Sequence, residues 1–389
     1  MVIATKVSLA SILVFIFLAF LPFGQILRVP FSFLGKEVYL NVSDTVALIA
    51  LTVGLFSKFK YPKFWKSAKD FLLVTAFSLL ASLALFTPAE LLLGSFYFLR
   101  LVSYFYLFLM FWNYFKKQVG FKDTVFKGIV LSTLFIAVFG WIQYLFYPDL
   151  RSLLFYNWDE HLLRMVGGFL DPTFTGLFLV FGANAATLIY FKESRREWLF
   201  ASLFLLVSLA FTYSRASYLA AFFSLGTLGI IQKKFKETAA LSIFLIGAIL
   251  FLPGGEGEGV KLTRVASIFA KTENYREALN LAKISPIYGV GYNNVCITKT
   301  KLPGGEDKNS HACSGLDASV LFLLVTTGVL GVFSFTNLVA AVAGSLKKDI
   351  YGKVVIAFGA ALLIHSLFAN SLFYSWTMGL IAILLALAS

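Results

Sequence analysis

Apolar residues run along the chain in long blocks that short polar segments separate. A helix needs about 20 mostly apolar residues to cross the ~30 Å hydrocarbon core of a bilayer, and most of the blocks have about that length. Strands of a membrane barrel would alternate apolar and polar positions instead. The pattern therefore predicts an all-α, polytopic membrane protein with about 12 transmembrane helices. The predicted spans are residues 7–27, 39–56, 71–86, 91–114, 125–147, 172–191, 198–213, 216–231, 239–252, 316–344, 354–369 and 372–388.

The segments between the blocks differ in charge on the two sides of the predicted membrane. One side holds the N-terminal Lys6, Lys127 and five short basic loops, with 19 Lys and Arg against 6 acidic residues. The other side has 14 of each, so the net charge of +13 lies on one face. Positive loops stay in the cytoplasm, which places both termini there. The charge is thus a topology signal, and we expect no nucleic-acid partner.

Composition agrees with this interpretation and locates the extramembrane parts. The chain is 59% hydrophobic and only 14% charged, with a mean hydropathy of +0.83, which excludes a soluble domain. We expect one membrane domain over residues 1–389, with outer loops at 148–171 and 253–315. The second is too long for a simple connector, so the function is expected there.

One arginine stands at the break between two predicted spans, in the stretch "FTYSRASYLAAF" (Phe211–Phe222). Arg215 could reach lipid head groups from a lipid-facing position. Its polar neighbours favour an inward-facing pocket instead, and an ionisable group within a membrane is a functional candidate. A guanidinium binds phosphate oxygens as a planar fork, which points to an anionic lipid head group as ligand. The polar neighbours are Thr212, Tyr213, Ser214 and Ser217.

The large outer loop supplies further cations, namely Arg264, Arg276 and Lys283. Tyr275–Ile284 carries apolar residues at helical spacing and predicts an amphipathic helix against the membrane surface. The following "SPIYGVGYNN" predicts a turn. Its Gly-x-Gly lacks the strand and helix context of a nucleotide-binding loop.

Three histidines are present, and they show no metal-ligand spacing. His311, in the polar end of the large loop, is best placed to accept a proton. His161 lies in the first outer loop beside two acidic residues, and His365 is interpreted as a helix-packing residue. The expected chemistry rests on arginines and one base, with no protein-bound metal and no cofactor.

Both cysteines, Cys296 and Cys313, lie in the large loop on the predicted oxidising side. They could form a disulfide, which for a loop of this size contributes about 3 kcal/mol in the chain-entropy model. Two separate thiols are an equal alternative. A disulfide would restrain His311, which lies two residues before Cys313.

Four stretches, in this order, resemble motifs of the O-antigen ligase/polymerase superfamily of bacterial membrane glycosyltransferases. They cover about residues 160–335, and the first five spans resemble the family only in hydropathy. The stretches are "RMVGGFLDPTFTGLFLV", "TYSRASYLAAF", "YREALNLAKISPIYGVGYNN" and "NSHACSGLDASVLFLLVTTGVLGVF".

The resemblance implies a donor glycan linked to undecaprenyl diphosphate and, for ligases, lipid A-core as acceptor. Transfer would occur at the periplasmic face of the inner membrane, without a metal and with inversion of the anomeric carbon. By position, Arg215 and Arg276 would hold the diphosphate, Arg264 would assist, and His311 would be the general base. No role carries over to Asp171, because "DPT" stands where many relatives have Pro-Asn.

Alternatives remain. A polymerase would join lipid-linked repeat units with the same motifs, whereas the single dominant outer loop and compact length favour a ligase. A transporter of lipid-linked sugars would show internal repeats and midplane polar residues, and neither is visible. Peptidoglycan glycosyltransferases of the shape, elongation and division type use an outer-loop aspartate, and the motifs around Asp307 and Asp317 do not resemble theirs.

Overall fold

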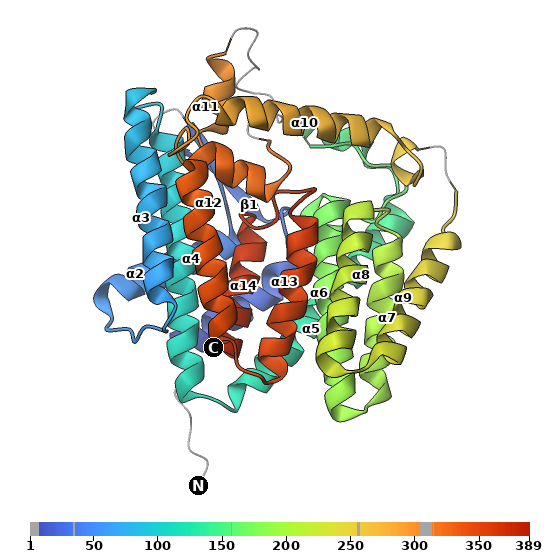
Figure 1. The fold of residues 1–389 in the computed structure, drawn as a ribbon. Coiled ribbons are helices and arrows are strands. Elements are labelled where there is room, and N and C mark those ends of the chain that lie inside the picture. The colour runs from blue at the N-terminus through green and yellow to red at the C-terminus, as the bar shows by residue number, and fades with distance from the viewer. Residues whose placement is uncertain (1–7, 34–35, 157, 255–256, 303–312, 314) are drawn as a thin grey trace.

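Helices make up most of the chain in the computed structural model, which describes residues 8–33, 36–156, 158–254, 257–302, 313 and 315–389 (Figure 1). They are α1 (Leu9–Phe20), α2 (Val42–Phe56), α3 (Trp65–Ala81), α4 (Leu92–Lys117), α5 (Phe121–Phe146), α6 (Pro172–Glu193), α7 (Arg196–Ala210), α8 (Arg215–Gln232), α9 (Phe235–Leu250), α10 (Ala266–Ala282), α11 (Val295–Thr300), α12 (Ser319–Ser345), α13 (Ile350–His365) and α14 (Ser375–Ala388). Short 3-10 turns are η1 (Leu21–Phe23), η2 (Ser82–Ala84), η3 (Arg151–Tyr156), η4 (Gly167–Phe169) and η5 (Glu258–Val260).

Each of the twelve predicted blocks contains one helix, which confirms the helical class. Five helices of the described chain are long and apolar enough to cross a membrane by themselves. The prediction of a membrane-embedded protein is therefore confirmed, and the number of twelve spans stays a prediction. The five are Trp65–Ala84, Leu92–Lys117, Phe121–Phe146, Pro172–Glu193 and Ser319–Ser345. Shorter apolar helices are Leu9–Phe23, Val42–Phe56, Ile350–His365 and Ser375–Ala388.

A β-hairpin interrupts the helical pattern between the first two predicted spans, which the all-α prediction missed. Strands β1 (Arg28–Phe33) and β2 (Lys36–Asn41) pair antiparallel, with Val29 opposite Leu40. The predicted span from residue 39 therefore begins late, at Val42. The Asn41 side chain accepts from the Asp44 amide and forms a capping box with it, which fixes the start of α2.

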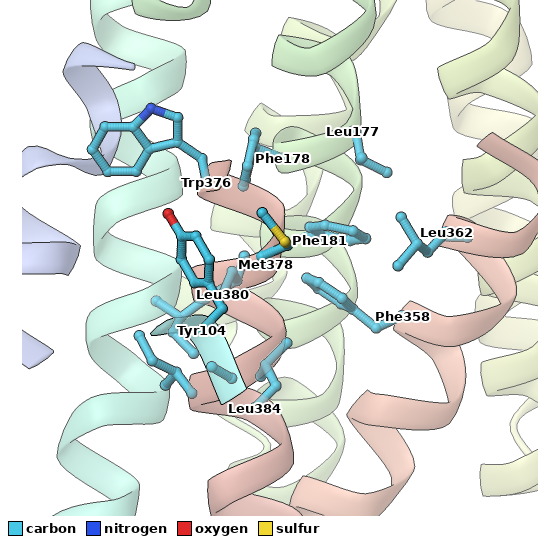
Figure 2. Close-up of a cluster of buried hydrophobic side chains, with 14 of the residues drawn as sticks. Tyr104, Leu177, Phe178, Phe181, Phe358, Leu362, Trp376, Met378, Leu380 and Leu384 are labelled. Carbon is cyan, nitrogen blue, oxygen red and sulfur yellow. The ribbon is translucent and has the colours of Figure 1, made fainter. Parts of the chain in front are cut away.

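The centre of the bundle is packed by aromatic and aliphatic side chains from four helices (Figure 2). Tyr104 of α4 and Phe181 of α6 lie there, together with Phe358 of α13 and Trp376 of α14. All four are buried. Because lipid tails are as apolar as these side chains, close packing rather than water exclusion holds such helices together.

The two ends of the bundle differ, as the sequence predicts. Helix α10 lies across one end, which we name the loop end (Figure 1). The connections α4–α5, α6–α7, α8–α9 and α12–α13 lie at the opposite end, which we name the basic end (Figure 1). Four of the five basic loops thus lie at one end, and the large loop covers the other.

Helix α12 is broken at Gly328, whose φ of 66° and ψ of −168° are not helical. The turn predicted from "SPIYGVG" fills the break. The amides of Val329 and Leu330 donate to the carbonyls of Pro286 and Ile287, at 2.9 and 3.1 Å. The turn thus replaces hydrogen bonds that a continuous helix would make, and it ties the large loop to α12.

Candidate functional site

The Ser-Arg motif forms the turn between α7 and α8, at the loop end. Ser214 caps α8, because its hydroxyl accepts from the Ser217 amide, and Arg215 is the first helical residue. Thr212 and Ser217 are fully buried. Tyr213 adopts a left-handed backbone with φ of 50°, which reverses the chain between the helices. The polar neighbours of Arg215 are therefore buried in the protein, and the pocket around Arg215 stays a prediction.

Three arginines from separate segments meet at this turn, and we call Arg164, Arg215 and Arg264 the arginine cluster. Arg164 donates to the carbonyls of Thr212 and Tyr213, at 3.1 and 3.4 Å. Arg264 donates to the same Tyr213 carbonyl at 3.2 Å. Arg215 donates back to the large loop, including the Arg264 carbonyl at 3.1 Å. Both outer loops and the Ser-Arg motif thus build one site.

The positive charge of this cluster is concentrated. Burial, together with the neighbouring Arg264, lowers the pKa of Arg164 to about 10, so the side chain remains charged at neutral pH. Asp171 and Asp159 lie near enough to act on Arg164 in the opposite direction. Guanidinium groups gathered in this way are suited to bind anionic oxygens.

His161 lies close to the cluster and is buried, with 8% of its surface exposed. Neither ring nitrogen has a hydrogen-bond partner of standard geometry among the described residues. Burial, and then the charge of Arg164, lower its pKa, although Asp159 and Asp171 act in the opposite direction. The ring is therefore a neutral base next to guanidinium groups.

His365 and Asp171 are structural residues in this geometry. Asp171 caps α6, because its carboxylate accepts from the amides of Thr173 and Phe174. The His365 Nε2 donates to the Thr173 carbonyl at 3.1 Å, and its Nδ1 lies 2.6 Å from the Ser371 hydroxyl. We assign this tautomer from the hydrogen-bond network. These contacts agree with the packing interpretation of His365.

The described hydrogen bonds of Arg276 do not connect it to the arginine cluster. It lies on α10, is 69% exposed, and pairs with Glu273 of the same helix at 3.0 Å. Helix α10 is longer than predicted, Ala266–Ala282 instead of Tyr275–Ile284. Lys299 of α11 and Glu277 of α10 form a pair at 2.7 Å, which joins the two helices.

His311 lies outside the described residues, but both ends of its segment are fixed. Cys296 and Cys313 form a disulfide with an S–S distance of 2.06 Å. Cys313 is fully buried, and Cys296 belongs to α11. The disulfide therefore joins Cys313 to α11, and the alternative of two separate thiols is wrong.

Arg164 and Arg100 are two buried or half-buried cations that the motifs do not indicate as functional residues. Arg164 stands in "HLLRMVGGF", and its place in an apolar run was the available signal. Arg100 lies in α4 and pairs with the buried Asp44 of α2 at 2.8 Å. Within the described chain, no three His, Cys, Asp or Glu residues gather as metal ligands would.

Comparison with known proteins agrees with the motifs. Residues 200–336 match the family model described as O-antigen ligase. No curated protein matches the chain. The matched segment contains Arg215, Arg264, Arg276 and both cysteines, and it ends shortly after the break in α12. This match supports the resemblance to the O-antigen ligase/polymerase superfamily that the motifs indicate.

Proposed function

We propose that this protein is an O-antigen ligase-type glycosyltransferase. It would move a glycan from undecaprenyl diphosphate to a hydroxyl of lipid A-core. The observation that carries this proposal is the arginine cluster at the Ser-Arg turn, two of whose members lie within the segment that matches the family. The family implies a lipid-linked glycan as substrate, and such a lipid presents a diphosphate at the membrane surface.

The cluster suits the departure of a diphosphate. When the bond between the anomeric carbon and the diphosphate oxygen breaks, both electrons stay on that oxygen and negative charge grows there. Arg215 and Arg264 are held in place by backbone carbonyls, so they need little rearrangement to stabilise this charge. Arg164, which the sequence analysis did not select, adds a third cation.

Arg276 would join the donor site from α10. Its pair with Glu273 is exposed, and such pairs contribute little free energy, so a phosphate can replace the carboxylate. The resemblance and the position of α10 across the loop end support this role. The described hydrogen bonds of Arg276 do not connect it to the arginine cluster.

His311 would take the proton of the acceptor hydroxyl while that oxygen bonds to the anomeric carbon. The carbon then inverts, undecaprenyl diphosphate leaves, and neither a metal nor a cofactor takes part. The disulfide at Cys313 supports this assignment, because it fixes the chain two residues from His311. His161 is the alternative base.

A polymerase would use the same donor residues with a lipid-linked repeat unit as acceptor. The single dominant outer loop favours the ligase. For topology, we propose twelve spans in the bacterial inner membrane, with both termini in the cytoplasm and the site facing the periplasm. The separation of the basic end from the loop end supports this orientation.

The test is transfer by purified protein from a defined undecaprenyl-diphosphate glycan to lipid A-core in detergent. Removing one cation from the diphosphate should cost about 3 kcal/mol of barrier, so we expect Arg215→Gln to be about a hundredfold slower. Arg195→Gln, which removes an exposed cation at the basic end, is the matched control and should retain activity. His311→Ala should be inactive, and a chelator should have no effect.

Wild-type rates for Arg215→Gln would remove the arginine cluster from the mechanism. Transfer in detergent, where no compartments exist, would exclude a pure transporter. Deletion in the cell separates the two enzymes. Loss of a ligase accumulates lipid-linked polymer, whereas loss of a polymerase leaves single repeat units on lipid A-core.

A further inference from the structure

An apolar crevice lies between α2, α4 and the β-hairpin. Helix α4 lies on the side of the bundle opposite α7–α9 (Figure 1). The volume of the crevice is about 190 Å³. Phe31 and Leu99 line it and are 48% and 43% exposed, so the crevice opens on the lateral surface that would face lipid. Leu48 and Phe96 line its walls. An apolar cavity of ~150 Å³ holds benzene, so this crevice has room for a segment of one hydrocarbon chain.

One charged pair interrupts the apolar lining. Arg100 and Asp44 both line the crevice and lie 2.8 Å apart. The Asp44 carboxylate also accepts from the Tyr104 hydroxyl at 3.0 Å and from the Asn41 amide at 3.4 Å. It therefore has partners on both oxygens, and it is almost fully buried.

The guanidinium has fewer partners than donors. Its two described hydrogen bonds, to Asp44 and to the Tyr39 carbonyl at 3.1 Å, both use Nη2. The guanidinium also lies over the Tyr97 ring, at 4.9 Å from the ring centroid. A guanidinium carries five N–H groups, and among the described residues no hydrogen bond from Nε or Nη1 of Arg100 is present. Beside hydrocarbon, an N–H without an acceptor costs several kcal/mol, so an acceptor oxygen in the crevice would stabilise the site.

The position of the pair narrows the choice of acceptor. Asp44 lies in the first turn of α2, whose cap Asn41 bonds Ser375 at the start of α14. Helical side chains tilt toward the N-terminus of their helix, so the Arg100 side chain points toward the N-terminal end of α4. In the proposed topology, the guanidinium would therefore lie near the boundary between head groups and hydrocarbon, which is where acyl ester carbonyls lie in a bilayer.

We propose that this crevice binds a diacyl glycerophospholipid, with one acyl chain between α2 and α4 and an ester carbonyl accepting from Arg100. The pair of Arg100 and Asp44 has no net charge, so a neutral carbonyl suits it better than a phosphate. A polyprenyl diphosphate has no ester carbonyl, and its anionic head suits the arginine cluster instead. The crevice is therefore a second lipid site with a different chemistry.

The test is photolabelling of the full chain in phosphatidylethanolamine vesicles that contain a trace of phospholipid with a diazirine on one acyl chain. Mass spectrometry should find the label on residues 44–48 and 96–103. A diether phospholipid with the same head and chains, but without carbonyls, should label the crevice about tenfold less, the factor for a hydrogen bond of ~1.4 kcal/mol. Equal labelling by the two lipids would overturn the role of Arg100.

Two variants complete the test. Leu99→Trp fills the mouth of the crevice and should remove its label, whereas Leu219→Trp, an exposed position on α8, should leave it unchanged. The double variant Arg100→Gln with Asp44→Asn avoids an uncompensated carboxylate and should label equally with diester and diether lipids. Label that persists in Leu99→Trp would refute the site. Displacement by equimolar lipid A but not by unlabelled phospholipid would also overturn the proposal, because it would assign the crevice to the acceptor.

Discussion

Replacing Gly328 by alanine tests whether the break in α12 is required by the fold. A Cβ on this residue would lie 2.3 Å from the carbonyl carbon and oxygen of Ile287, which are backbone atoms that cannot rotate away. The residue also has φ of 66° and ψ of −168°, a region that only glycine adopts without strain.

The cost of Gly328→Ala follows from these two facts. A non-glycine residue in this backbone region costs about 1–3 kcal/mol. The turn must also move away from the new Cβ, so the amides of Val329 and Leu330 lose their acceptors as well, at about 1 kcal/mol for each bond. We expect the free energy of unfolding to fall by about 3–5 kcal/mol.

The matched control is Gly344→Ala in the same helix, where a Cβ would meet nothing within 4 Å. Alanine is the better helix former by about 0.5–1 kcal/mol, so this variant should be neutral or slightly more stable. Denaturant unfolding of the two purified variants in detergent measures the difference. Equal stability of Gly328→Ala and Gly344→Ala would show that the break is incidental.

The other predictions concern the loop end. Arg164→Gln removes charged hydrogen bonds to the turn and should destabilise the fold by about 1.5–3 kcal/mol, measured by the same unfolding assay, whereas the exposed Arg151→Gln in the same loop should change it little. Replacing Cys296 and Cys313 by serine should cost about 3 kcal/mol, because the bond closes a sequence separation of 17, and unchanged unfolding would contradict this. The pKa of His161 is lower in the folded protein than in the unfolded chain. As the pH falls, the unfolded chain therefore binds a proton at His161 before the folded protein does. Stability should therefore be lost as the pH falls below about 6.5, and His161→Gln should weaken that dependence in unfolding curves between about pH 7.5 and 5.

The sequence predicts helices well where a long apolar block marks them. It does not predict short elements whose structure depends on contacts with distant parts of the chain. The hairpin Arg28–Asn41 has only six residues in each strand, too few to separate from the ends of neighbouring apolar blocks. Helix α10 is longer than its apolar spacing predicts, and Lys271 in its added part contacts Asp317 and the Phe368 carbonyl, which spacing along the chain does not reveal.

The candidate site shows the same limit. The motifs favour Arg215 and Arg276 as the main cations and Arg264 as an assisting one. The structure instead joins Arg215 to Arg264, and Arg276 pairs with Glu273. Arg164 gains its importance from carbonyls 48 and 49 residues away in the chain, so composition and spacing could not identify it. The motif order, in contrast, was sufficient to identify the superfamily that residues 200–336 match.

The turn seated in α12 also decides how this protein can be recombined with its relatives. A chimaera that exchanges residues 253–315 would join one protein's turn to another protein's helix, and the graft would have to supply both the donors after Gly328 and the carbonyls of Pro286 and Ile287. The natural unit of exchange therefore runs from before the turn to beyond Gly331, across the apparent border between loop and span. Acceptor specificity, if it resides in the large loop, would be inherited together with this part of the membrane domain.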